Sequence, residues 1–184
     1  MIKRPVDSAD NLLFLSRRLE VRVFRPEDIT ATYLDALNAN EIVGLTEARH
    51  QHWNIANATQ YIENSNKLGE SILFRVSLRE VDKSIGNIRL FNFHEVHNRA
   101  ELSFLFYDQE EWGKGYATEA IDTVVNYGFE SLKLHRIHAD YYELNSRSGR
   151  VFEKLGFEIE GIYRDHFFFD DMYIDSVRVG KIAK

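Results

Sequence analysis

Apolar and polar residues alternate along several stretches of the chain, and this two-residue period predicts β-strands. In residues 71–78, for example, Ile72, Phe74, Val76 and Leu78 share one face of the expected strand. Short clusters of turn residues, such as Asp170-Asp171, separate neighbouring stretches. The strands predicted in this way are residues 19–24, 71–78, 84–93, 99–107, 136–142, 157–169 and 172–179.

A second pattern, with apolar residues three and four positions apart, predicts helices. The clearest helix carries Ala117, Ala120, Ile121, Val124 and Gly128 on one face. Residues 38–57 show no such period and are expected to be irregular. The other predicted helices are one that opens at residues 25–28 and continues through Ile29, Tyr33 and Leu37, a short one at residues 59–67, and one that starts at Asn145 or Ser146 and ends at Gly156.

This mixture of elements predicts an α/β chain, in the α+β sense, with one hydrophobic core. The length of 184 residues is sufficient for such a core. No repeat, low-complexity tract or linker interrupts the sequence. We therefore expect residues 1–15 to be a lead-in segment and residues 16–184 to form a single domain.

Composition narrows the classes of partner. The net charge is −6 without a basic block, so nucleic acid is not an expected partner, whereas a cationic amine or a basic protein is compatible. No apolar run is long enough for a membrane span and no signal peptide is visible, which favours a cytoplasmic location. The absence of cysteine excludes thiolate metal sites and a cysteine acyl-enzyme. The histidine pairs lack ligands at metal-binding spacing, so no metal is expected.

A strand, a pair of glycines and a helix follow one another between Tyr107 and Phe129. The glycines are Gly113 and Gly115, with Lys114 between them. Glycine lets the backbone approach a ligand closely, and the start of a helix presents free N–H groups and a positive dipole end. This segment therefore predicts a phosphate site, although a purely structural tight turn would show the same glycines.

Two common phosphate motifs do not fit this spacing. A P-loop requires serine or threonine after its Gly-Lys pair, whereas Gly115 follows Lys114. A dinucleotide-binding loop would have its third small residue where Thr118 stands, and it would follow the strand directly. The rest of the chain must therefore decide which phosphate compound is bound.

Two longer motifs carry a family resemblance. Residues 112–120 read W-G-K-G-Y-A-T-E-A, and residues 145–157 read N-S-R-S-G-R-V-F-E-K-L-G-F. In this order they resemble the GNAT acetyltransferases, especially the branch of the ribosomal-protein-alanine N-acetyltransferases, and the resemblance extends over residues 19–182. It implies the GNAT fold: a mixed, mostly antiparallel sheet of about seven strands flanked by about four helices, with a splay between two central strands.

The chain departs from the family pattern at Glu110, where glutamine or arginine is usual. Glu111 follows directly, and two carboxylates beside a diphosphate would repel it. We therefore expect both side chains to point into solvent and the backbone N–H groups to hold the anion.

The resemblance implies acetyl-CoA as co-substrate, with its pyrophosphate at the glycine loop. Unpaired backbone groups in the strand before the loop would bond the pantetheine arm and polarise the thioester oxygen. Three groups of residues are expected at the cofactor: Trp112, Gly113, Lys114, Gly115, Tyr116, Ala117 and Thr118 around the pyrophosphate, Leu105, Phe106 and Tyr107 along the arm, and Asn145, Ser148 and Phe152 near the sulfur.

Amide formation from a thioester also needs a base for the amine and an acid for the leaving thiolate. Asp140 stands where related alanine N-acetyltransferases carry a glutamate, and Glu101 is a second candidate base. Each could instead form an ion pair with a nearby arginine, and each could act through a water. Phe152 occupies the place of a tyrosine that many GNAT enzymes use as the acid, and phenylalanine cannot donate a proton. Ser148 matches the serine proposed as donor in the alanine branch, although it could simply cap a helix with Asn145.

The acceptor stays open at this level. A protein N-terminal amine is favoured by the motif resemblance, and an amino group of a nucleotide-linked sugar or a polyamine is an alternative. The irregular segment contains Arg49 and Trp53, which are expected either at the acceptor or in surface packing. The aromatic residues 163–169 are interpreted mainly as hairpin packing, with a share at the acceptor or between two copies of a homodimer. A non-catalytic acyl-CoA-binding module is a further alternative.

Overall fold

The computed structural model describes residues 12–67 and 69–184 and arranges them around one sheet of eight strands. The sheet order is β1-β2-β3-β4-β5-β6-β8-β7, and every neighbouring pair is antiparallel except β5 and β6, which are parallel. The strands are β1 (Leu13–Leu15), β2 (Leu19–Val23), β3 (Ser71–Leu78), β4 (Lys83–His94), β5 (Arg99–Phe106), β6 (Arg136–Tyr142), β7 (Glu158–Phe169) and β8 (Met172–Ile182).

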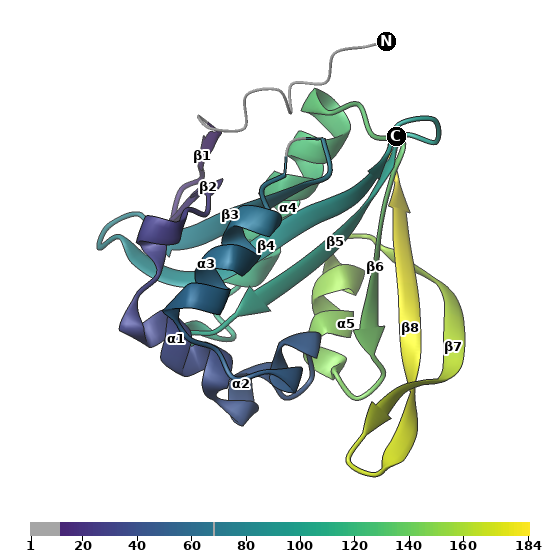
Figure 1. Cartoon of the computed structure of the whole chain (residues 1–184). Helices are drawn as coiled ribbons and strands as arrows, with labels where there is room; N and C mark the ends of the chain where they lie inside the picture. Colours follow the sequence, from purple (N-terminus) through teal and green to yellow (C-terminus); the bar gives the residue numbers. More distant parts are fainter. Residues whose placement is uncertain (1–11, 68) are drawn as a thin grey trace.

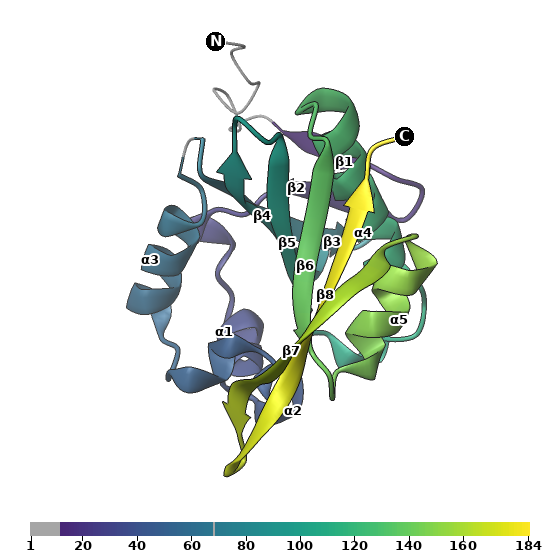
Figure 2. The ribbon, with the colours of Figure 1, turned by 90° about the vertical axis from the view of Figure 1, so that its right-hand side faces the viewer.

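Helices cover both faces of the sheet, which gives three layers (Figure 2). On one face lie α1 (Ala31–Asn38), α2 (Asn40–Val43) and α3 (Ile55–Asn64), together with a 3-10 turn at Glu47–His50. On the other face lie α4 (Tyr116–Asn126), which continues into a π turn at Tyr127–Ser131, and α5 (Ser146–Lys154). The β7–β8 hairpin extends beyond the rest of the sheet (Figure 1).

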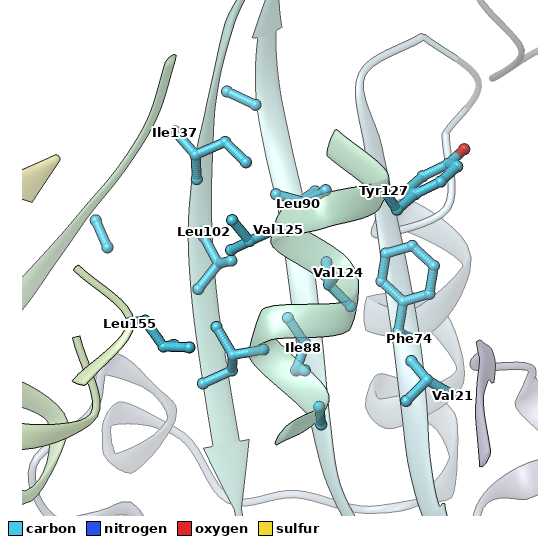
Figure 3. Close-up of a cluster of buried hydrophobic side chains, with 14 of the residues drawn as sticks. Val21, Phe74, Ile88, Leu90, Leu102, Val124, Val125, Tyr127, Ile137 and Leu155 are labelled. Atoms are coloured by element: carbon cyan, nitrogen blue, oxygen red, sulfur yellow. The ribbon is translucent and has the colours of Figure 1, made fainter. Parts of the chain in front are cut away.

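The main hydrophobic core lies between the sheet and α4 (Figure 3). Ile88, Leu102 and Ile137 from the strands meet Val124 and Val125 from the helix, and each is at most 2% exposed. Because α4 is anchored along its length, its N-terminal end is held in a fixed position relative to β5. A second cluster on the opposite face joins α1 and α3 to the sheet.

The predicted fold class is confirmed, with small differences in the number of elements. The sheet has eight strands rather than about seven because Leu13–Leu15 pairs with β2. These residues belong to the expected lead-in segment, of which residues 1–11 lie outside the described residues. A fifth α-helix arises because α2 forms one turn in the segment expected to be irregular. That residues 16–184 form one domain stays a prediction.

The first helix starts later than predicted. Pro26–Asp28 forms only a 3-10 turn, in which the Asp28 carboxylate accepts a hydrogen bond from the backbone N–H of Arg25 at 2.9 Å. The backbone is extended at Ile29, and α1 begins after Thr30, whose hydroxyl oxygen accepts from the N–H of Tyr33. Proline followed by acidic residues suits a 3-10 turn as well as the first turn of an α-helix, which explains the error.

The second helix, predicted at residues 59–67, begins and ends earlier in the chain than predicted. In the structure α3 spans Ile55–Asn64, and its N-cap is Asn54. The side chain of Asn54 accepts from the N–H of Asn57, and the side chain of Asn57 accepts from the N–H of Asn54. This reciprocal cap resembles a capping box but uses two asparagines instead of the usual serine and glutamate, so the sequence signal was weak.

The predicted splay lies between β5 and β6. The two strands pair through Arg99 with Arg136, Ala100 with Ile137 and Glu101 with His138, and no further. Beyond these pairs β5 continues along β4 as far as Phe106, while β6 continues along β8. The strands therefore diverge, and α5 lies behind the opening between them (Figure 1).

Candidate active site

The glycine loop forms one end of the site. Gly113 and Gly115 have positive φ angles of 77° and 84°, a conformation that glycine adopts without strain. Gly115 is the N-cap of α4, so the N–H groups of the first helical turn, from Tyr116 to Thr118, have no intrahelical acceptor. A pocket of about 550 Å³ adjoins this turn and is lined by Gly115, Thr118, Glu119, Asp122, Lys154 and Leu155. The loop therefore offers several N–H donors to an anion.

The acidic residues before the loop behave differently from each other. The side chain of Glu110 is 85% exposed, as expected. The expectation for Glu111 is wrong, because its side chain is only 13% exposed and accepts from the ammonium group of Lys114 at 2.7 Å. Lys83 lies 3.8 Å from Glu111 and 2.6 Å from Asp108, and the hydrogen bond with Asp108 raises the pKa of Lys83. Two lysines thus offset most of the negative charge that would otherwise repel a diphosphate.

Arg18 also reaches the loop, from the turn between β1 and β2. Its guanidinium donates to the carbonyl of Lys114 at 3.0 Å and to the carboxylate of Glu119 at 2.7 Å, and it lies over the ring of Tyr116. Sequence reasoning missed this residue because it lies far from both motifs and belongs to no motif of its own. It adds a positive charge beside the N-terminus of α4.

The backbone of β5 presents alternate residues to the gap. The N–H of Tyr107 donates to the carbonyl of Ile85 at 3.0 Å, so the expectation that this backbone N–H is unpaired is wrong. The backbone N–H and C=O of Leu105 also point towards β4, where Leu105 lies opposite Asn87, because backbone groups in an antiparallel strand alternate in direction. By the same alternation Phe106, which lies between them, directs its N–H and C=O away from β4 and towards the gap.

Trp112 fixes this edge of the gap. Its indole N–H donates to the carbonyl of Phe106 at 2.8 Å, which links the glycine loop to the end of β5. The guanidinium of Arg147, from α5, lies 4.6 Å from the centre of the indole ring. The N–H of Phe106 is then the backbone group of this residue that remains to bind a ligand.

The two candidate bases lie on the sheet face that also carries α1 and α3. Asp140 forms a bidentate ion pair with Arg178 of β8, at 2.8 and 2.5 Å, which is the ion pair that the sequence offered as the alternative to a base. The two residues are direct neighbours across the β6–β8 pair, and the hydrogen bonds with Asp140 raise the pKa of Arg178. Both oxygens of this carboxylate are therefore engaged.

Glu101 is less constrained. Its carboxylate accepts from the side-chain amide of Asn92 at 2.9 Å and lies 3.9 Å from the imidazole of His138, which is its neighbour across the β5–β6 pair. Burial lowers the pKa of His138, although Glu101 opposes this effect, so the imidazole is neutral at pH 7. His138 was not selected from the sequence as a site residue, since a histidine within a strand gives no distinctive signal.

The residues expected near the sulfur gather around α5. The side chain of Asn145 caps this helix by accepting a hydrogen bond from the N–H of Ser148 at 3.1 Å, which is the helix cap that the sequence offered as an alternative to a role at the sulfur. Phe152 is only 2% exposed and packs against Phe104 and Phe157. Tyr141, which the sequence did not single out, stacks on Phe152 at 6.0 Å between ring centres.

Comparisons with known proteins show which family the chain belongs to. A family model described as the acetyltransferase (GNAT) domain matches residues 18–158. The chain belongs to this family. It is 31% identical over 149 residues, 81% of its length and 84% of the relative's, to an uncharacterized N-acetyltransferase, YnaD, of Bacillus subtilis. Shorter matches are N-acetyltransferase p20 of Bacillus licheniformis, also uncharacterized, at 33% identity over 58% of this chain, and spermidine N(1)-acetyltransferase of Escherichia coli K12, at 32% identity over 51%.

The chain spans only 60% and 50% of the length of the last two GNAT relatives. Solved structures share the fold at lower identity. The ribosomal-protein-S5-alanine acetyltransferase of Vibrio fischeri has a TM-score of 0.82 at 22% identity, covering 95% of this chain and 98% of that one. The spermidine N-acetyltransferase of Vibrio cholerae, solved with CoA and spermine, has a TM-score of 0.79 at 21% identity, covering 91% and 96%.

In this GNAT domain the 3-10 turn at Glu47–His50 contacts the end of β6 and the β7–β8 hairpin, on the sheet face that carries Glu101. The hydroxyl of Tyr142, at the end of β6, forms a hydrogen bond with Glu47. Arg49 donates to the carbonyl of Phe168 at 2.7 Å and lies over the ring of Phe169, so it ties this turn to the β7–β8 hairpin.

Trp53, expected either at the acceptor or in packing, belongs to the second core cluster. It is 5% exposed and its indole N–H donates to the carbonyl of Ala48 at 2.9 Å. Phe168 is 56% and Tyr173 63% exposed on the hairpin, and a contact of these rings with an acceptor or with a second copy stays a prediction.

Among residues 12–67 and 69–184, no helix is both long and apolar enough to cross a membrane. In the same part of the chain, no three histidine or acidic side chains are grouped as a metal site would require.

Proposed function

We propose that this chain is an N-acetyltransferase that transfers an acetyl group from acetyl-CoA directly to a primary amine. The observation that carries the proposal is the gap between β5 and β6, which opens beside a glycine loop at the N-terminus of α4. An extended pantetheine arm suits such a gap between strands, and its pyrophosphate suits the helix N-terminus. Direct transfer is favoured because the chain has no cysteine to carry the acetyl group.

The residues around the loop fit the CoA diphosphate. The unpaired N–H groups of the first turn of α4 supply the donors, while Lys114 and Arg18 offset the carboxylates of Glu111 and Glu119 beside them. The N–H of Phe106 points into the gap and is positioned to donate to a carbonyl oxygen there, while Trp112 holds this residue in place. When bound, acetyl-CoA supplies the activated acetyl group.

For the base we propose Glu101 rather than Asp140. The bidentate pair with Arg178 occupies both oxygens of Asp140, and protonating that carboxylate would break two charge-assisted hydrogen bonds. Glu101 has an uncharged amide and a neutral imidazole beside it, so it retains an oxygen that can accept a proton from an amine or a water.

Of the acceptor classes, a protein N-terminal amine is the first that we propose. It is supported by the paired sequence motifs and by the likeness in fold to the alanine acetyltransferase from Vibrio fischeri. A polyamine is the second, because the sheet face that carries Glu101 also has the carboxylate of Glu47 beside it, the chain has a net charge of −6, and spermidine acetyltransferases are among the sequence relatives.

An assay with labelled acetyl-CoA tests the proposal. The purified chain is incubated with peptides that begin with alanine or serine, with spermidine, and with a nucleotide-linked amino sugar. We expect transfer to at least one of these amines and saturable CoA binding by calorimetry. CoA binding without transfer to any primary amine would refute the enzyme and favour a non-catalytic acyl-CoA-binding module.

Glu101→Gln is the matched variant for the base. We expect turnover to fall about 100-fold, the lower range for loss of a general base, with CoA affinity unchanged. An unchanged turnover would exclude Glu101 from this role.

A further inference from the structure

Tyr141 lies on β6 with its side chain towards α5, on the opposite face from Asp140. Its ring is inclined by only 25° to the ring of Phe152. Its hydroxyl lies against Gly149, where an added Cβ would come within 3.0 Å of the phenolic oxygen. The hydroxyl therefore sits over α5, one turn before Phe152.

The same hydroxyl lies beside the gap. β5 and β6 stop pairing after Glu101 and His138, and Phe104 and Tyr141 are each three residues further along. Phe104 packs on Phe152 at 5.5 Å between ring centres, so the rings of Phe104 and Tyr141 both rest on Phe152 from the two sides of the gap. In Figure 1, α5 is visible behind this opening.

The hydroxyl of Tyr141 is available for chemistry. Within the described ranges no residue forms a hydrogen bond with it, and it is not among the buried polar atoms that lack a partner, so solvent or a ligand reaches it. Burial raises the pKa of the Tyr141 phenol, which therefore keeps its proton at neutral pH. Phe152 leaves no proton donor on the adjoining ring.

We propose that Tyr141 is the proton donor to the CoA sulfur, an inference that rests on the acetyl transfer proposed above. The amine nitrogen forms a bond with the thioester carbonyl carbon and loses a proton to Glu101 or water. As the C–S bond breaks, its electron pair goes to sulfur, and Tyr141 releases its phenolic proton to that sulfur. The products are the amide and the CoA thiol, and the tyrosinate regains a proton from water.

This placement differs from the one that the family resemblance implies. The backbone N–H of Ser148 already donates to the Asn145 side chain, and the serine hydroxyl is on a short side chain of α5. A phenol is a stronger acid than an alcohol, so it donates more readily to a departing thiolate. The donor thus comes from β6 and not from α5.

Tyr141→Phe tests the proposal, because it removes one oxygen and retains the stacked ring. We expect kcat to fall about 100-fold. Adding Phe152→Tyr to this variant places a hydroxyl on the neighbouring ring, and we expect it to recover at least tenfold of the loss. The control is Tyr127→Phe, which removes another partnerless hydroxyl, buried in the core away from the gap, and is expected to leave kcat unchanged.

A binding measurement separates this inference from the proposed function. We expect Tyr141→Phe to weaken CoA binding about threefold, the effect of one neutral hydrogen bond, and to leave desulfo-CoA binding unchanged. Equal losses for both ligands would show a packing role and overturn the proposal, as would a kcat within twofold of wild type or no recovery by Phe152→Tyr. If the wild type acetylates no amine, the proposed function fails, and an unchanged ratio of CoA to desulfo-CoA affinity then overturns the role of Tyr141 as well.

Discussion

Replacing Asp140 with asparagine distinguishes a structural carboxylate from a catalytic one. The side chains of Asp140 and Arg178 are 22% and 28% exposed, so their ion pair lies between the exposed and the buried classes. Exposed pairs contribute at most about 1 kcal/mol, whereas breaking a buried pair costs about 3 to 5 kcal/mol. With solvent screening, and with Arg178 still over the ring of Tyr163, we expect a loss of about 1.5 kcal/mol.

For a domain of this size such a loss lowers Tm by about 3 to 6 °C, measurable by calorimetry. If the carboxylate is structural, turnover of the folded Asp140→Asn protein stays within about fivefold of wild type. If Asp140 is instead the catalytic base, its loss should lower turnover about 100-fold to 10,000-fold, and the fall in Tm would not account for a loss of that size.

Two further variants complete the experiment. Arg178→Gln should cost a similar amount of stability, and the double variant should cost little more than either single one, because both remove the same interaction. Asp28→Asn is the matched control, since Asp28, in the 3-10 turn after β2, also forms a bidentate pair, with Arg22 of β2. A 100-fold loss of turnover in Asp140→Asn but not in Asp28→Asn would refute the structural interpretation.

Three other predictions concern the loop, the buried histidine and the indoles. Gly115→Ala should lower the free energy of unfolding by about 1 to 3 kcal/mol, because of the positive φ at this position, and should also weaken CoA binding. Gly69→Ala, at a similar φ of 76°, should lower stability alone. Equal CoA affinity in the two variants would contradict the loop assignment. Because burial lowers the pKa of His138, the unfolded state binds a proton at a higher pH than the folded state, so the free energy of unfolding should fall as the pH drops below about 6.5. His138→Gln should reduce this dependence of the free energy of unfolding on pH, as measured by urea titration, and an unchanged dependence would exclude His138 as its source. Trp112→Phe and Trp53→Phe each lose one indole hydrogen bond to a backbone carbonyl, worth about 1 kcal/mol, but only Trp112→Phe should weaken CoA binding in calorimetry, so a matching loss in both would argue against its place at the gap.

The sequence by itself determined the elements whose signals are local. The alternation in residues 71–78 and 136–142 predicted β3 and β6 with the same bounds that the structure shows. The glycine loop and the Asn145 cap were predicted because positive φ angles and free helical N–H groups require particular residue types at particular places. The splay between β5 and β6 came from the family resemblance, not from periodicity.

Only the tertiary structure decided which charged and polar side chains meet. Asp140 faces Arg178 because β8 returns beside β6, and Arg18 reaches Lys114 because β2 lies near the start of α4. Tyr141 meets α5 for the same kind of reason, and no pattern in its own strand indicates it. Local sequence specifies the backbone path of an element, but an ion pair or a stacked ring depends on register and packing between segments distant in the chain, and these are set when the core forms.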